Sequence, residues 1–234
     1  MTTTTTLHDK FFENPLMTFD HKTLYWIIGL SATLIMTMTI ADFAAAKFLD
    51  IGLGVVTPAG ALLFAVVFVV RDMLHKLAGA AITQRVILIG VVLNLAMAAF
   101  MYAMTFIPAP AFRPSVNFDA VFKMSLGIVI GSEIATVASQ WVNTVIYQKL
   151  WERDYGSWAR TFWSNLLSLP VDAVLFVMFA FVFIPPLLGG NAMDMDKAIA
   201  RIVSGSTLFK LAVILALTPL VSLAPWRQEA KLMK

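Results

Sequence analysis

Several ionisable side chains occur within long apolar segments of this chain, where they are costly to bury. Asp42, Asp72, Asp172 and Lys210 are the clearest cases, and Glu133 is a fifth. An ionisable group inside a bilayer costs roughly 2.5–3.5 kcal/mol on insertion scales. A purely structural protein has little reason to keep several of them. These carboxylates and this ammonium therefore indicate a site that binds a polar solute or carries protons.

Polar residues also repeat at helical spacing in two of these segments. In the fourth segment Glu133, Thr136, Gln140 and Asn143 follow one another at three or four residues, so they share one helix face. The fifth segment has a similar stripe, which ends at Asp172. Its other members are Arg160, Ser164 and Ser168, and Asn165 lies beside them. Pro170 is expected to break a backbone hydrogen bond of this helix and so to expose backbone groups that a ligand could use.

Each of these features has a structural alternative. Ser, Thr and Asn side chains commonly hydrogen-bond between membrane helices, and for the isolated Asn94 this interpretation is favoured. Lys210 could simply neutralise Asp42 or Asp172 as a buried ion pair. For Asp72, Asp172 and the Gln140 stripe a functional role is favoured.

Other chemistries lack their residues in this sequence. There is no cysteine, no G-x-x-x-x-G-K-[ST] loop and no H-E-x-x-H motif. The three histidines are too dispersed for a metal site, and no nucleophile stands with a base and an orienting group. We therefore expect no enzyme, no metal and no cofactor.

The composition indicates the elements that must hold these residues. Hydrophobic residues make up 59% of the 234 residues and charged residues 13%, against about 45–50% and about 25% in soluble domains. The sequence predicts an all-α polytopic membrane protein with six transmembrane helices. The expected spans are residues 24–46, 58–78, 86–107, 121–147, 158–184 and 203–223, with Thr57 and Pro58 expected to cap and begin the second.

The distribution of Lys and Arg predicts the orientation. Eleven fall on the side of the two termini and five on the other, so both termini are expected in the cytoplasm and the protein in the inner membrane. The expected organisation is a polar N-terminal segment at 1–23, the transmembrane domain at 24–225 and a basic tail at 226–234.

The motifs resemble those of a known family, the queuosine-precursor transporters (the VUT or DUF165 membrane proteins). The similarity extends from about Thr39 to Leu220, with three departures: Asp42 for the usual Asn, Asn143 for the usual Asp, and Lys76 for a frequent acid. The matching residues are Ala41–Asp42, Gly60, Phe64, Phe68, Asp72, Gly79, Ser132, Ala135, Gln140, Asn143, Asp172 and Phe209–Lys210.

The resemblance implies a six-helix importer of 7-cyano- or 7-aminomethyl-7-deazaguanine, salvaged for tRNA modification. In that case a carboxylate would accept the donors of the base and a Gln or Lys would donate to its carbonyl. Phe64 and Phe68, one helical turn apart, could stack on the ring. The predicted binding residues are Asp42, Phe64, Phe68, Asp72, Ser132, Gln140, Asn143, Asn165, Asp172 and Lys210.

The expected partners are a small purine-like substrate and the lipid bilayer, without direct nucleic-acid contact; a homo-oligomer is left open. A secondary transporter coupled to protons through Asp72 or Asp172 is one hypothesis. The alternative is the substrate-binding subunit of a modular vitamin importer driven by a separate ATPase, docked on small residues such as Ala41, Ala44 and Ala45. A scaffold without transport should tolerate the loss of Asp72 or Gln140.

The predicted residues are expected to lie at different depths. Asp42 and Lys210 fall toward the outer side, Asp172 near the middle and Asp72 toward the inner side. One small base cannot contact all of them, so we expect the polar groups to divide between a binding site and a gate or proton path.

Overall fold

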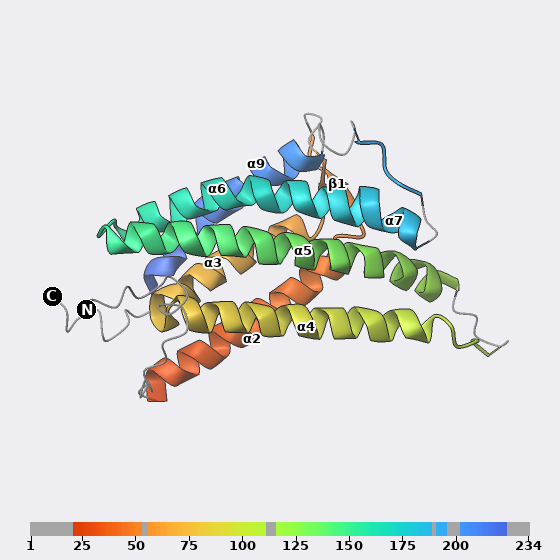
Figure 1. The fold of residues 1–234 in the computed structure, drawn as a ribbon, viewed down its shortest axis with the longest axis horizontal. Coiled ribbons are helices and arrows are strands. Elements are labelled where there is room, and N and C mark those ends of the chain that lie inside the picture. Colours follow the sequence, from red (N-terminus) through yellow and green to blue (C-terminus); the bar gives the residue numbers. More distant parts are fainter. Residues whose placement is uncertain (1–20, 53–55, 111–115, 189–190, 196–201, 224–234) are drawn as a thin grey trace, which may run out of the picture.

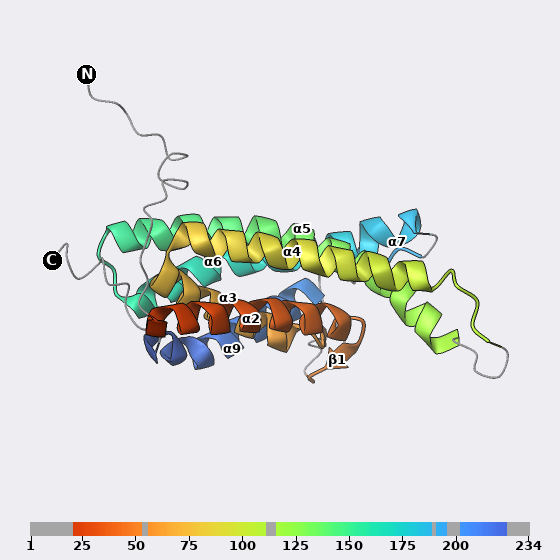
Figure 2. The ribbon, with the colours of Figure 1, turned by 90° about the horizontal axis from the view of Figure 1, so that it is seen from below.

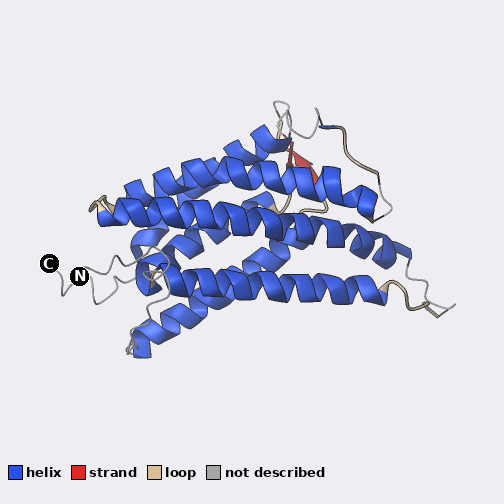
Figure 3. Cartoon of the chain, viewed as in Figure 1, coloured by secondary structure: helices blue, strands red, loops and turns tan. Residues whose placement is uncertain are grey.

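The computed structural model describes residues 21–52, 56–110, 116–188, 191–195 and 202–223. Helices dominate, and the strands in the described part are two three-residue segments (Figure 3). The elements are α2 (His21–Ala44), β1 (Phe48–Asp50), β2 (Val56–Pro58), α3 (Ala61–Ala78), α4 (Ala80–Met104), α5 (Val116–Glu152), α6 (Ser157–Val177), the π-helix η1 (Met178–Phe183), α7 (Ile184–Leu187), α9 (Ser204–Leu217) and the 3₁₀ segment η3 (Thr218–Leu223).

Five helical stretches in the described part are long and apolar enough to cross a membrane. They are 21–44, 80–104, 121–152, 157–187 and 204–221. The prediction of an all-α, multi-pass membrane protein is therefore confirmed. α3 covers the second predicted span but falls outside this set because it carries Arg71, Asp72 and Lys76. The number six and the location of the termini stay predictions, and most of the 1–23 segment and all of the 226–234 tail lie outside the described residues.

The helices form an elongated bundle of two layers (Figures 1 and 2). α4, α5 and α6 run side by side along its length, while α2, α3 and α9 cross beneath them. α5 packs on α6 and α4, and α3 packs on α2 and α9. The start of α2 and the end of η3 lie at the same end of the bundle (Figure 1).

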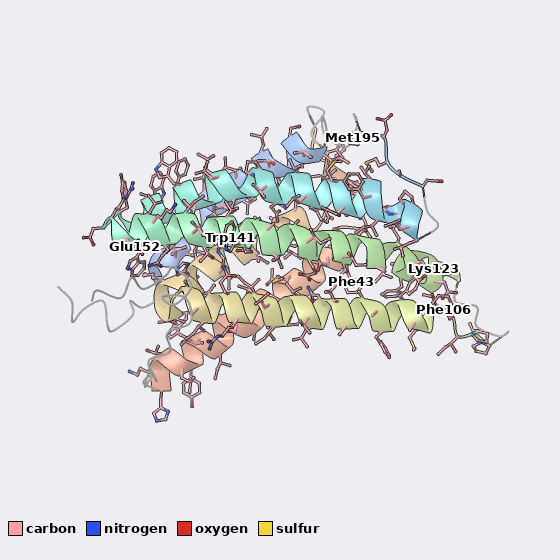
Figure 4. The ribbon with its side chains drawn as sticks, viewed as in Figure 1. Phe43, Phe106, Lys123, Trp141, Glu152 and Met195 are labelled. Atoms are coloured by element: carbon pink, nitrogen blue, oxygen red, sulfur yellow. The ribbon has the colours of Figure 1, made fainter. Side chains whose placement is uncertain are left out.

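α3 lies in the centre of this bundle. All but three of its 18 residues are buried. The other helices turn apolar side chains outward instead. Leu93 and Phe100 of α4 are exposed, and so is Trp141 of α5, which Figure 4 labels. The molecule thus has an apolar exterior and a polar centre, as a bilayer requires.

A short hairpin replaces the expected start of the second span. Thr57 and Pro58 belong to β2, which pairs antiparallel with β1 in the register Leu49↔Thr57, and α3 begins only at Ala61. The expectation that Thr57 caps the helix and Pro58 begins it is wrong. The pairing with β1 gives the backbone groups of Thr57 and its neighbours hydrogen-bond partners within the protein. This pairing is possible because the helix begins further along the chain.

The small residues of α2 pack inside the bundle. Ala41 and Ala45 are 0% and 2% exposed, and a Cβ on Gly60 would lie 2.1 Å from the Ala41 carbonyl oxygen. The expectation that Ala41 and Ala45 offer a docking surface for another subunit is therefore wrong. These residues let the end of α2 approach the start of α3 closely.

The irregular part of the fifth span lies beyond Pro170. α6 continues through Pro170, whose side chain is exposed on the outer face. The backbone departs from α-helical geometry only at η1, from Met178 to Phe183. Single π-helical turns inside α-helices often mark functional positions, so η1 replaces Pro170 as the notable irregularity.

Replacing Gly131 by alanine is expected to destabilise the protein by about 1–3 kcal/mol. A Cβ there would stand 2.5 Å from the Ala180 backbone nitrogen and 2.7 Å from its Cα, so α5 and η1 would have to separate. The measurement is the thermal unfolding of the protein in detergent. Gly29→Ala is the control, because nothing lies within 4 Å of that Cβ. If both variants melted together with the native protein, the close contact of α5 with η1 would carry no stability.

Candidate functional site

The buried polar residues form three groups along the bundle. We call them the ion-pair cavity, around Asp172 and Lys210; the arginine network, around Arg71 and Asp72; and the carboxyl pair, Asp42 and Glu133 with Asn94 between them. Their residues are nearly all under 5% exposed. The predicted division of the polar residues into separate groups agrees with this arrangement.

The ion-pair cavity joins α6 to α9. Lys210 Nζ donates to Asp172 Oδ2 at 2.6 Å, and Ser139 Oγ donates to Asp172 Oδ1 at 3.1 Å. The space is about 10 Å³, close to what one water molecule requires, so the cavity is too small for a base as it stands. The lining residues are Ala45, Pro58, Gly60, Ala61, Phe64, Ser132, Ala135, Asp172, Phe176, Ser206 and Lys210.

Two aromatic rings flank the ammonium. Lys210 Nζ lies 5.0 Å from the centre of the Phe64 ring and 5.9 Å from that of Phe176. A ring face attracts a cation, more so where water is excluded. The cavity therefore presents an acceptor, a donor and an aromatic face side by side. Phe64, Ser132, Asp172 and Lys210 are the predicted binding residues that the structure brings together here.

Phe68 lies elsewhere. Its ring is fully buried and has the Arg71 guanidinium 5.1 Å from its centre. Phe64 and Phe68 share a helix face, yet Phe68 is absent from the residues that line the ion-pair cavity. Their spacing therefore indicates a common face of α3 without placing both rings at one ligand.

The arginine network is centred on α3. Arg71 donates from Nε to Asp72 Oδ1 at 3.0 Å, from Nη1 to Gln140 Oε1 at 2.5 Å and from Nη2 to Asn165 Oδ1 at 3.1 Å. Asn165 Nδ2 in turn donates to Asp72 Oδ2 at 3.1 Å. Both carboxylate oxygens of Asp72 and the Gln140 carbonyl thus already accept hydrogen bonds from the protein.

Asn143 extends this network between α5 and α6. Its Nδ2 donates to Asn165 Oδ1 at 2.8 Å and to Ser168 Oγ at 3.2 Å. The two polar stripes predicted for the fourth and fifth segments therefore face each other. Asp72, Gln140, Asn143 and Asn165 are brought together, and none of the four lines the ion-pair cavity.

Arg71 is the residue that the sequence interpretation missed at this place. Arg71 is one of the eleven cations that predict the orientation of the chain, and the sequence interpretation gave it no role in the site. The signal was present, because Arg71 stands next to Asp72 in an otherwise apolar run. A cation beside an anion at that depth indicates pairing within the bundle.

The carboxyl pair spans three helices. Asn94 of α4 donates from Nδ2 to Asp42 Oδ2 of α2 at 3.0 Å and to Glu133 Oε1 of α5 at 2.8 Å. The Thr39 hydroxyl donates to the Asn94 carbonyl oxygen. Asn94 is therefore an interhelical contact, as expected, and it joins two ionisable groups.

A second, larger cavity lies toward the end of the bundle that carries η1 and α7. It measures about 570 Å³, within the range of roughly 300–1,000 Å³ typical of ligand pockets. Phe181 lines it and packs edge-to-face on Phe176, with ring centres 5.5 Å apart. Phe181 also contacts Phe48 at 5.0 Å. Because Phe176 lines the ion-pair cavity, the contact between Phe176 and Phe181 joins the walls of the two cavities.

Comparison with known proteins gives one family. The family described as "Putative vitamin uptake transporter" matches residues 58–224. That range holds α3 to η3, with the ion-pair cavity's Asp172 and Lys210 and the whole arginine network. Neither the curated proteins nor the solved structures gave a match.

Proposed function

Since the chain belongs to the family described as "Putative vitamin uptake transporter", we propose that it is an inner-membrane importer of 7-cyano- or 7-aminomethyl-7-deazaguanine, and that it works as a secondary transporter. The imported base would serve tRNA modification. The family and the five membrane-crossing helical stretches support transport. The deazaguanine substrate is proposed from the motifs and from the ion-pair cavity.

The observation that carries the substrate is the Asp172–Lys210 pair beside the Phe64 ring. A deazaguanine has N–H donors along one edge and a carbonyl acceptor next to them. A carboxylate accepts both donors, while an ammonium donates to the carbonyl. The base would therefore insert between Asp172 and Lys210 and exchange their ion pair for its own hydrogen bonds, with Phe64 against its ring.

Binding of the base would require the ion-pair cavity to widen. The ion-pair cavity has room for about one water, whereas the cavity lined by Phe181 is large enough for a base. We propose that the base enters through the larger cavity and that Phe176 and Phe181 separate to admit it. The π-helical turn that carries Phe181 is the element expected to rearrange.

The test is queuosine in the tRNA of cells that can neither make the precursor nor import it. Cells that express this chain are supplied with each of the two deazaguanines in turn. Queuosine should appear with at least one base, and the initial uptake of a labelled base should fall when a large excess of the same unlabelled base competes with it. If the protein is confirmed in the membrane and neither base restores queuosine, the substrate proposal is wrong.

Purified protein in vesicles, together with the same cells, distinguishes a secondary transporter from an ATPase-driven subunit. Purified protein in lipid vesicles without ATP should exchange labelled for unlabelled base. Uptake in cells that lack any partner ATPase should persist as well. If vesicles never exchange the base and cells import it only when a partner ATPase is present, the modular vitamin importer would replace the secondary transporter.

A further inference from the structure

Two buried carboxyls lie outside the ion-pair cavity, and the proposed substrate contacts do not use them. Asp42 is 1% exposed and Glu133 is 3% exposed. A single amide nitrogen, Asn94 Nδ2, donates to both, at 3.0 and 2.8 Å. Since the Thr39 hydroxyl donates to the Asn94 carbonyl oxygen, the amide is held with both N–H groups toward the carboxyls.

The described residues supply no cation to this pair. The ion pairs in that part of the chain are Arg71–Asp72 and Asp172–Lys210. Two further cations are buried there: Lys76 donates to the Val221 carbonyl oxygen, and Arg160 lies over the Trp151 ring. Glu133 and Asp172 lie within electrostatic reach of Asp42, and both are acidic. Two ionised carboxylates here would place an uncompensated double charge in the bundle, which is strongly unfavourable.

The neighbouring elements do not change this balance. α4 carries Arg85, which is exposed, and η1 and α7 carry no ionisable residue. α3 carries Arg71, Asp72, His75 and Lys76, α6 carries Arg160 and Asp172, and α9 carries Lys210. Among these, Arg71 is paired with Asp72 and Lys210 with Asp172. The lysines nearest along the chain, Lys47 after α2 and Lys123 within α5, are both exposed.

Unused oxygen atoms mark where a ligand could bind. Asp42 Oδ1 and Glu133 Oε2 are buried and have no hydrogen-bond partner in the described part of the chain. Ser132 Oγ is buried likewise, close to the Asp42 carboxyl, and equally lacks a partner of hydrogen-bond geometry among the described residues. A metal cation between the carboxyls would meet the Asn94 nitrogen, which donates and cannot ligate. A proton on one carboxyl oxygen needs no further space.

We propose that Asp42 and Glu133, bridged by Asn94, form the proton-binding site that couples uptake to the proton gradient. This inference rests on the proposed transport function. A proton from the outer solution forms an O–H bond on one carboxyl oxygen, and deprotonation toward the inner solution breaks that bond. One proton on the pair leaves one negative charge, which the Asn94 amide stabilises.

The position of Ser132 gives the coupling a physical route. Ser132 lines the ion-pair cavity and precedes Glu133 on α5, and Asp42 is within electrostatic reach of Asp172. Protonation of the pair reduces the negative charge beside the cavity in which the base must part Asp172 from Lys210. By linkage, substrate binding changes the proton affinity by the same factor as proton binding changes the substrate affinity.

The test uses purified protein in lipid vesicles and each labelled deazaguanine in turn. An alkaline interior should accelerate initial uptake by native protein about tenfold. Glu133→Gln and Asp42→Asn should lose that acceleration while they still exchange base for base. Glu152→Gln should keep the acceleration. Glu152 is exposed, and it lies at the end of α5 that is distant from Phe43, the residue that follows Asp42 (Figure 4).

The outcomes separate this inference from the transport proposal. If native protein exchanges the base but Glu133→Gln keeps the full acceleration, or a sodium gradient drives uptake in place of protons, the proton site is wrong and the transport proposal stands. If native protein exchanges neither base, the transport proposal fails on its own. Infrared spectra in acidic and alkaline buffer then still test the pair: a protonated-carboxyl band should titrate in native protein and be lost in Glu133→Gln, and its persistence there would overturn the inference.

Discussion

Replacing Lys210 by methionine is expected to lower the initial rate of deazaguanine uptake at least about 30-fold, because loss of one partner of a buried charge pair costs about 2–5 kcal/mol and each 1.4 kcal/mol is tenfold. Lys210 is the ammonium in the ion-pair cavity, 2.6 Å from Asp172 and 5.0 Å from the Phe64 ring centre. Methionine keeps the length and apolar volume but removes the donor to the base. The measurement is labelled base uptake by cells with equal amounts of protein in the membrane.

A double variant separates binding from stability. Lys210→Met alone leaves the Asp172 carboxylate buried without its cation, so the protein should also melt earlier. Asp172→Asn combined with Lys210→Met removes both charges and should recover thermal stability while uptake stays lost. Lys149→Met, on an exposed lysine of α5, is the matched control. Native uptake by the double variant would mean that the pair is structural and that the base binds elsewhere.

Replacing Arg71 by methionine is expected to lower the free energy of unfolding by about 3–5 kcal/mol, the usual cost of breaking a buried ion pair by removing one partner. Arg71 is fully buried and donates to Asp72, Gln140 and Asn165, which come from three helices. Its loss leaves Asp72 Oδ1 and Gln140 Oε1 without the Arg71 donor and the Asp72 charge uncompensated, while Asn165 Oδ1 keeps its hydrogen bond from Asn143. Thermal unfolding in detergent measures the effect.

Arg85→Met is the matched control for this prediction. Arg85 lies exposed on α4, and exposed charges contribute little to stability. Its melting temperature should stay within a few degrees of the native value. If Arg71→Met melted like Arg85→Met and yet abolished uptake, the arginine network would act on substrate directly, and Asp72 and Gln140 would return to the binding site.

The sequence predicted the elements well because their signal is local. Long apolar segments and the residues that break them located most helix ends to within a few residues. For example, α6 begins at Ser157, and its expected start is residue 158. The hairpin of β1 and β2 escaped prediction. Its strands have three residues each, too few for a period-two pattern, and Thr57–Pro58 carries a helix-start signal that the strand pairing overrides.

The site was less predictable because it depends on contacts between distant segments. The types of residue were informative: an acid, a lysine, a phenylalanine and a serine from α6, α9, α3 and α5 do meet in one cavity. The sequence could not say that Phe68 pairs with Arg71 while Phe64 faces Lys210. Nor could it say which of Asp42 and Asp172 takes Lys210, a choice that only the packing of α6 on α9 decides.

The burial of α3 also has a consequence for how the protein is made. α3 leaves the ribosome with Arg71, Asp72 and Lys76 close together, a segment that lipid alone does not readily accept. Gln140 and Asn165, which receive hydrogen bonds from Arg71, are synthesised 69 and 94 residues later. We therefore expect α3 to wait at the translocon, or against α2, until α5 and α6 arrive. In a nascent chain that ends before Asn165, Arg71 would lie in the membrane without all of its hydrogen-bond partners. We therefore expect stable insertion of α3 only after the later helices have been synthesised.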